Sequence, residues 1–335
     1  MNNTRWLITN EIIKKISLDN SFHESYDNDG IVDGYISKFA AKPEMGFNFG
    51  YLIFIPISLL TNPILIIEGP SVSEIGPIEK AIEIVYNKAV FELSTGGFPH
   101  FLAKKLHCPI IMPLFPRPED KENNTDIFTH ALTSQSMSIA DSPIARIDLQ
   151  LIAMFEDIKN RFLHANIELY DRFIVKGFSA GGEFAHRFTV LHPNYVLAAI
   201  SGGCMHSFTL PLKTYYGETL LWPNGLGNMD QYSNINPCFE EYQSIQQLFY
   251  MGDIDYNDSV PYRDSYTEEE RQQVYRLFGK IGMPDRWNLY QELIKELKLN
   301  HIVCITQHGI DHKPGNDIRQ YIVNYLQNII QPSNE

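Results

Sequence analysis

A serine in a predicted tight turn between a strand and a helix is the feature with the clearest chemical potential. Residues 177–181 have the pattern G-x-S-x-G, with Ser179 at its centre. An apolar run at 173–175 predicts a buried strand before the turn, and an apolar helical pattern that ends at Pro193 follows it. Such a turn strains the serine backbone and presents the hydroxyl at a helix N-terminus, where backbone N–H groups favour developing negative charge. The sequence therefore predicts a nucleophilic serine; the alternative is an ordinary glycine-rich connection.

A serine nucleophile needs a base that takes its proton and an acid that orients the base. Asp253, Asp255 and Asp258 lie just past one predicted strand, and His308 and His312 lie just past the last one. Strand ends of this kind face the ligand crevice in open α/β sheets. Taken singly, an Asp after a glycine is a common turn residue, and a His near a helix start is often a surface residue. Taken together, serine, acid and histidine at three strand ends, in that order along the chain, indicate a catalytic triad.

The segments at 177–182, 252–255 and 309–312 resemble the nucleophile, acid and histidine motifs of α/β-hydrolase-fold serine esterases. The group they resemble most is that of polyhydroxyalkanoate-depolymerase-like bacterial esterases. The resemblance spans roughly residues 50–330 and is specific for the fold but weak for the substrate. It implies a small-molecule ester substrate and no cofactor.

The resemblance also implies which acid and which histidine would serve. In such enzymes the acid closes a G-x-x-D turn, which falls on Asp255, and the histidine closes a G-x-x-H turn before the last helix, which falls on His312. Asp253 and His308 remain the alternatives.

An oxyanion hole is the third part that the resemblance implies. The backbone N–H of Ala180 would be one donor, and that of Ser71 would be the other. The loop at 68–73 lacks the His-Gly-Gly motif, and Pro70 has no N–H to donate, so Ser71 is the simplest assignment.

Predicted strands that alternate with predicted helices must position these residues. This alternation predicts an α/β fold with a mostly parallel, doubly wound sheet and helices on both faces, which the resemblance identifies as an α/β-hydrolase fold. Strands are expected at 31–39, 48–56, 63–69, 109–114, 173–175, 196–200, 245–250 and 300–306, and helices at 78–93, 98–107, 142–164, 267–277, 285–297 and 314–329. Ser142 is the expected N-cap of the helix at 142–164, and Pro143 is its first-turn proline. Thr267 and Glu270 form a capping-box pattern at the start of the helix at 267–277. Because no linker or internal repeat is apparent, residues 1–335 are expected to form a single domain.

The segment 204–243 has no clear periodicity and separates two predicted strands at the catalytic edge of the sheet. Its many apolar side chains make it unsuited to a solvated loop. One interpretation is a cap over Ser179, with Tyr215, Tyr216 and Trp222 lining a pocket for a small or aromatic ester. The alternative is an ordinary extension of the core.

Composition narrows the classes of partner. The chain has 335 residues, 44% of them hydrophobic, which is enough for a large core, and its net charge of −13 argues against nucleic acid or an anionic membrane as partner. The longest apolar run is too short to span a bilayer, and the first residues lack the layout of a signal peptide. Four scattered cysteines without metal-ligand spacing predict free thiols, a cytoplasmic location and no metal site. The sequence does not determine the oligomeric state, and a homo-oligomer is one of the possible states.

Three functional interpretations follow. The first is a carboxylesterase-like serine hydrolase that works through an acyl-enzyme. The second keeps the same triad for acyl transfer or for thioester or amide cleavage. The third is a non-catalytic binding protein that retains the fold, since fold alone does not fix function.

Overall fold

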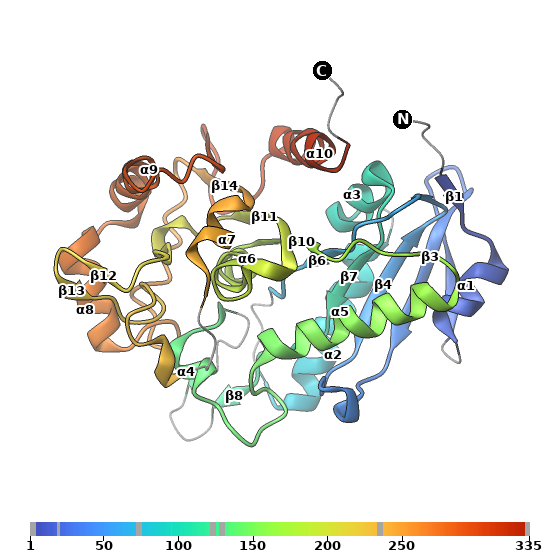
Figure 1. The fold of residues 1–335 in the computed structure, drawn as a ribbon, viewed down its shortest axis with the longest axis horizontal. Helices are drawn as coiled ribbons and strands as arrows, with labels where there is room; N and C mark the ends of the chain where they lie inside the picture. Colours follow the sequence, from blue (N-terminus) through green and yellow to red (C-terminus); the bar gives the residue numbers. More distant parts are fainter. Residues whose placement is uncertain are drawn as a thin grey trace.

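One large mixed sheet organises the chain. The computed structural model describes residues 5–18, 21–71, 76–94, 96–120, 125–126, 131–232 and 237–331. Within these residues, nine strands form a sheet in the order β15-β14-β11-β10-β6-β7-β4-β3-β2 (Figure 1). The strands are β2 (Phe22–Tyr26), β3 (Val32–Phe39), β4 (Tyr51–Pro56), β6 (Ile66–Glu68), β7 (Ile110–Pro113), β10 (Phe173–Phe178), β11 (Val196–Gly202), β14 (Gln246–Gly252) and β15 (Ile302–Gln307).

The direction of the strands decides where a site can form. From β7 to β15 all neighbours pair in parallel, whereas β2, β3 and β4 form an antiparallel edge. The carboxyl ends of β6, β10, β11, β14 and β15 therefore meet at one edge of the sheet, which is where ligands bind in open α/β folds.

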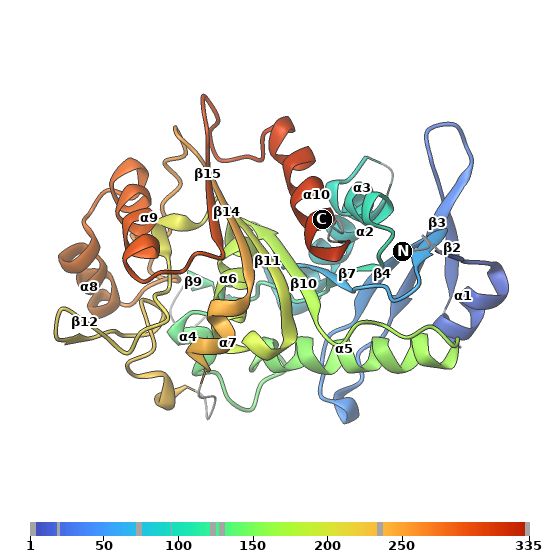
Figure 2. The same cartoon turned by 45° about the horizontal axis from the view of Figure 1, so that its top comes forward.

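Helices cover both faces of the sheet. In Figure 2, α3 and α10 lie on one side of the strands and α5 lies on the other. The helices are α1 (Asn10–Ser17), α2 (Ile78–Leu93), α3 (Phe98–Leu106), α4 (Ser134–Met137), α5 (Ile147–His164), α6 (Ala180–Leu191), α7 (Phe239–Ser244), α8 (Glu268–Phe278), α9 (Trp287–Glu296) and α10 (Asn316–Ile330).

The central strand β10 shows why both faces are covered. Its neighbouring residues enter different apolar clusters: Ile174 packs in the cluster with α2, α3 and α10, whereas Phe173 and Val175 pack in the cluster with α5 and α6. All three side chains are fully buried. Because side chains alternate along a strand, a continuous apolar run is what a sheet buried on both faces requires.

Most predicted elements are present at the predicted places. The helix expected at 78–93 has these bounds, and the capping box at Thr267 and Glu270 forms at the start of α8. The sheet and helices agree with the predicted α/β class, although β4, β3 and β2 are joined to the sheet by antiparallel pairings.

The expected start of the helix at Ser142 is wrong. Helix α5 begins at Ile147, because Arg146 has φ 47° and interrupts the helical path. The Arg146 Nε donates to Asp148 Oδ1 at 2.9 Å, and His192 Nε2 lies 2.8 Å from Asp148 Oδ2. Burial alone would raise the pKa of Asp148, but the hydrogen bonds from His192 and Arg146 outweigh it and hold the pKa at about 2.

The segment 204–243 contains short elements. They are η4 (Met205–Ser207), β12 (Thr214–Tyr215), β13 (Glu218–Thr219), η5 (Met229–Gln231) and α7. Strands β12 and β13 pair with each other as a hairpin, which lies beside α8 (Figures 1 and 2). Two other small pairings are β1 (Arg5–Leu7) with β5 (Ser58–Leu60) and β8 (Glu119–Asp120) with β9 (Thr125–Asp126).

Candidate active site

Ser179 occupies a strained turn between β10 and α6. Its φ of 58° and ψ of −127° place a non-glycine residue in a sparsely populated backbone region. The Ser179 N–H donates to the Gly202 carbonyl of the neighbouring strand β11 at 2.8 Å, which anchors the turn. The side chain is partly exposed. This is the geometry that a nucleophile elbow requires.

Two glycines make the turn sterically feasible. A Cβ at Gly177 would lie 2.1 Å from the Gly181 carbonyl oxygen, so β10 and α6 approach too closely for any other residue. A Cβ at Gly181 would lie 2.8 Å from the Gly69 carbonyl oxygen. The loop after β6 therefore packs directly against the first turn of α6.

His312 and Asp255 complete a hydrogen-bonded chain with the serine. His312 Nε2 lies 2.9 Å from Ser179 Oγ, and His312 Nδ1 lies 2.9 and 3.0 Å from the two carboxylate oxygens of Asp255. Asp255 is 1% exposed, so water hardly competes for its oxygens. A carboxylate at Nδ1 selects the tautomer whose Nε2 lone pair accepts the serine hydroxyl.

Close packing of two loops brings these groups together. Asp255 follows β14, and His312 lies in the loop between β15 and α10. A Cβ at Gly252 would lie 2.0 Å from the Ile310 carbonyl oxygen, and the Ile254 N–H donates to the same oxygen at 3.3 Å. The two loops thus touch through their backbones.

The alternative acid and histidine form a separate pair with each other. Asp253 Oδ2 lies 3.1 Å from His308 Nδ1, and Asp253 Oδ1 accepts the Gly309 N–H at 2.7 Å. The hydrogen bond from His308 lowers the pKa of Asp253. The third candidate, Asp258, is bound by the Arg286 guanidinium.

Asn257 is a residue at this site that the sequence analysis did not single out. Its Nδ2 lies 2.9 Å from His312 Nε2, the same nitrogen that faces Ser179, and its Oδ1 accepts from the Tyr262 hydroxyl at 3.2 Å. Because neutral imidazole has one lone pair at Nε2, the amide competes with the serine for it. In the sequence, only its position two residues after Asp255 indicates that Asn257 could lie near the histidine.

The two expected oxyanion donors belong to the start of α6 and to the loop after β6. Ala180 is the first residue of α6, so its N–H is among the helix N-terminal groups without an intrahelical acceptor. Ser71 follows Pro70 in the loop that packs against Gly181, and its carbonyl accepts from Lys88 Nζ. Residues 72–73 of this expected loop lie outside the described residues.

The three residues expected to bind substrate lie in different environments. Trp222 is fully buried in the core, and its indole N–H donates to the Leu132 carbonyl at 2.8 Å. Tyr216 is 86% exposed in the turn of the β12–β13 hairpin, and the Tyr215 ring stacks on Phe278. Among the described contacts, none joins these three side chains to the serine or histidine. Their part in substrate binding stays a prediction, and Trp222 has the burial of a core residue.

The described residues contain no group of three or more His, Cys, Asp or Glu side chains that could hold a metal ion. Among the described helices, none combines the length and apolarity needed to cross a membrane.

The sheet order, the elbow and the covering helices define an α/β-hydrolase fold. No family model matches the chain, and no curated protein matches it. Solved structures similar to it include a poly(3-hydroxybutyrate) depolymerase from Bordetella parapertussis, with a TM-score of 0.53 and 13% identity over 93% of this chain and 92% of that one.

Two further solved structures share the fold. Poly(aspartic acid) hydrolase-1 from Sphingomonas sp. KT-1 gives a TM-score of 0.51 and 16% identity over 86% of this chain and 97% of that one. An S-formylglutathione hydrolase from Agrobacterium tumefaciens gives a TM-score of 0.50 and 12% identity over 92% of this chain and 97% of that one. At these identities, the likeness concerns the fold.

Proposed function

We propose that the protein is a serine hydrolase that cleaves a carboxylic ester of a small molecule. The observation that carries this proposal is the hydrogen-bonded chain from Ser179 through His312 to Asp255, with the serine in a strained elbow. Strain and an aligned base are features that a structural serine does not need.

The proposed first half-reaction forms an acyl-enzyme. Ser179 Oγ attacks the ester carbonyl carbon while its proton passes to His312 Nε2, and Asp255 stabilises the resulting imidazolium. The negative carbonyl oxygen is held by the N–H groups of Ala180 and Ser71. The bond to the alcohol oxygen then breaks, and His312 gives its proton to the leaving alcohol.

The second half-reaction releases the acid. A water molecule gives a proton to His312 as its oxygen attacks the acyl carbon, and a second tetrahedral species forms. Its collapse returns the proton to Ser179 and frees the carboxylic acid. An alcohol or amine in place of water would give acyl transfer, and a thioester or amide would use the same steps with a different leaving group.

The proposal extends to the organisation of the chain. We take residues 1–335 as one α/β-hydrolase domain with 204–243 as an insertion at the catalytic edge. Cys108 and Cys204 are buried free thiols, and Cys238 and Cys304 are partly buried free thiols, which supports a reducing cytoplasmic setting.

A fluorophosphonate probe tests the proposal because it reacts with an activated serine. We expect the wild type to be labelled and Ser179→Ala to remain unlabelled while keeping its fold. Turnover of 4-nitrophenyl esters should fall on the order of a million-fold in Ser179→Ala if the triad acts as a unit. Ser244→Ala is the matched control, because Ser244 is exposed and bonds only the Glu241 carbonyl among the described contacts.

The same experiment separates the proposal from its alternatives. A binding protein without activity would leave the wild type unlabelled, and a well-folded Ser179→Ala with full turnover would refute the assignment. A panel of oxygen esters, thioesters and amides of graded acyl length, with and without an added alcohol acceptor, then distinguishes hydrolysis from acyl transfer.

A further inference from the structure

A small cavity lies directly beside the elbow. Its volume is about 230 Å³, and it is enclosed by the ends of β6, β10 and β14 and by residues of α2, α3 and α10. Its lining includes Ser71 and Phe178, whose ring centre is 4.8 Å from that of His312. Phe98 and Arg319 also line it. The same cavity is therefore lined by a residue of the proposed oxyanion loop and by a guanidinium.

Five charged side chains line this cavity, three of them positive and two negative. Lys176 forms a buried ion pair with Glu68 across neighbouring strands. Burial raises the pKa of Glu68, and the Lys176 ammonium opposes this rise. Lys88 donates to the Ser71 carbonyl and stands four residues before Glu92 on α2, a spacing that places opposite charges on one helix face. The fifth charged group is the guanidinium of Arg319.

Arg319 has no polar partner within the described part of the chain. Its Nε–H is buried and donates no hydrogen bond to the described residues, and its guanidinium carbon lies 5.5 Å from the centre of the Phe98 ring. By contrast, the buried Arg161, Arg187 and Arg286 each pair with a carboxylate. A partly buried guanidinium without an anion is unfavourable unless a ligand supplies one.

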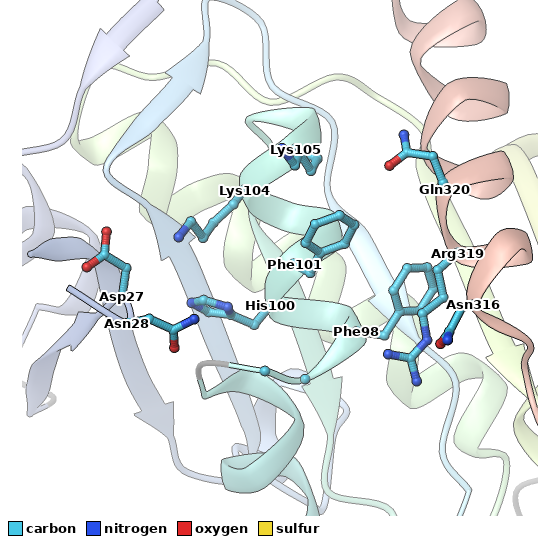
Figure 3. A pocket seen from close by; sticks show the side chains of 12 residues that line it. Asp27, Asn28, Phe98, His100, Phe101, Lys104, Lys105, Asn316, Arg319 and Gln320 are labelled. Atoms are coloured by element: carbon cyan, nitrogen blue, oxygen red, sulfur yellow. The ribbon is translucent and has the colours of Figure 1, made fainter. Parts of the chain in front are cut away.

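A second hollow adjoins the same two residues. Phe98 and Arg319 also line an open depression of about 530 Å³, together with His100, Lys104 and Lys105 (Figure 3). Lys104 pairs with Asp33 at 2.6 Å, whereas Lys105 is exposed. One carboxylate, Asp27, also lines this hollow, and its Oδ1 accepts two backbone N–H groups of its own turn. In a chain with a net charge of −13, this is a locally basic surface.

We propose that Arg319 binds a carboxylate of the substrate, so that the site takes short esters whose acyl part ends in a carboxylate. The inference rests on the proposed function. A carbonyl oxygen held between Ala180 and Ser71 directs the acyl chain into the cavity lined by Ser71 and Phe178. A volume of about 230 Å³ suits a chain of a few carbons, and a guanidinium in its lining matches a terminal carboxylate.

A matched pair of substrates tests the inference. Mono-4-nitrophenyl glutarate and 4-nitrophenyl pentanoate have the same leaving group and chain length, and only the first has an acyl carboxylate. We expect Arg319→Gln to lower kcat/KM for the glutarate ester by about 10- to 100-fold, mainly through KM, and to leave the pentanoate ester nearly unchanged. Arg319→Lys should retain part of the preference because it keeps the charge but loses the bidentate geometry.

Arg172→Gln is the control for removal of a guanidinium. Arg172 precedes β10 at the end of the strand opposite Ser179, so the ratio of the two kcat/KM values should not change. Calorimetric titration of glutarate into Ser179→Ala, with Arg319 present or replaced by Gln, gives a readout that needs no turnover. Glutarate should bind when Arg319 is present, and this binding should be lost when Arg319 is replaced by Gln.

The outcomes separate failure of this inference from failure of the proposed function. An unchanged ratio of the two kcat/KM values in Arg319→Gln, with fluorophosphonate labelling intact, overturns the carboxylate site alone. Absence of labelling and of turnover in the wild type overturns the proposed function. Even then, calorimetry still tests the carboxylate site: glutarate binding that is equal with and without Arg319 overturns it.

Discussion

Replacement of Gly181 by alanine tests the contact between the elbow and the oxyanion loop. Gly181 is the second residue of α6, and an added Cβ would lie 2.8 Å from the Gly69 carbonyl oxygen and 3.1 Å from that of Pro70. Both partners are backbone atoms, which cannot rotate away. The loop must retreat by about 0.6 Å to restore an ordinary contact of 3.4 Å, and Ser71 retreats with it.

The expected effect on stability is smaller than the effect on catalysis. Alanine is favoured over glycine inside a helix by about 1 kcal/mol, whereas overpacking costs about 1–3 kcal/mol. The free energy of unfolding should therefore fall by about 0–2 kcal/mol. Loss of one oxyanion donor lowers kcat about 100- to 1000-fold, and a misplacement of this size should reach the lower part of that range.

The assay compares kcat and KM for a 4-nitrophenyl ester with urea unfolding of the same proteins. We expect Gly181→Ala to lower kcat with little change in KM and to slow fluorophosphonate labelling. Gly76→Ala is the control in the neighbouring part of the chain, since its Cβ would meet only the flexible Lys80 side chain at 3.5 Å. Wild-type kcat in a folded Gly181→Ala protein would refute the proposed oxyanion loop, and a loss of stability above about 3 kcal/mol would show that the residue acts through folding.

Three further predictions follow from contacts described above. Asp255→Asn should lower kcat by about four orders of magnitude because the histidine tautomer is lost, whereas Asp253→Asn should leave kcat within about threefold; steady-state kinetics decide. The pKa of Asp148 in the folded protein is about 2, below its usual 3.8. Ionised Asp148 therefore stabilises the fold above pH 3.8, and this stabilisation is lost as the pH falls toward 2. In urea titrations, the difference in unfolding free energy between wild type and Asp148→Asn should shrink by about 2 kcal/mol over that pH window. Trp222→Ala should cost about 3–5 kcal/mol, and Tyr216→Ala less than about 0.5, by the same measurement, and a changed acyl-length preference in either folded variant would support the cap.

The sequence predicts the parts of this fold that depend on local patterns. An apolar run before a glycine-flanked serine predicts β10 and its turn, and the Thr267 capping box predicts the start of α8. These signals work because each lies within a few residues and has one dominant physical cause. The same reasoning fails for α5, where Ser142 and Pro143 give a valid start signal but Arg146 has φ 47° and the helix begins at Ile147. There Asp148 is bound by Arg146 and by His192, which is distant in the sequence.

Features made by contacts between distant segments could not be predicted. The Asn257 amide reaches His312 only because two loops pack together. Likewise, the lack of a hydrogen-bond partner for the Arg319 Nε among the described residues depends on the segments packed around it. The burial of Trp222 could not be predicted either, because a large aromatic residue in an irregular segment has no periodicity that indicates the direction of its side chain. Burial of an individual side chain in such a segment depends on the whole fold.

The two Asp–His pairs show how packing separates residues that a motif cannot. Asp253 and Asp255 both face a histidine, and the hydrogen-bond lengths are similar, at 3.1 and 2.9 Å. However, His308 is 88% exposed, so water competes for that pair, whereas Asp255 is buried under the loop that carries His312. The contact between Gly252 and Ile310 holds the two loops in a register that turns Asp255 inward and leaves Asp253 outside. A residue larger than glycine at position 252 would push the two loops apart and displace both Asp–His pairs. We therefore attribute the selection of Asp255 as the triad acid to this backbone contact more than to the chemistry of either carboxylate.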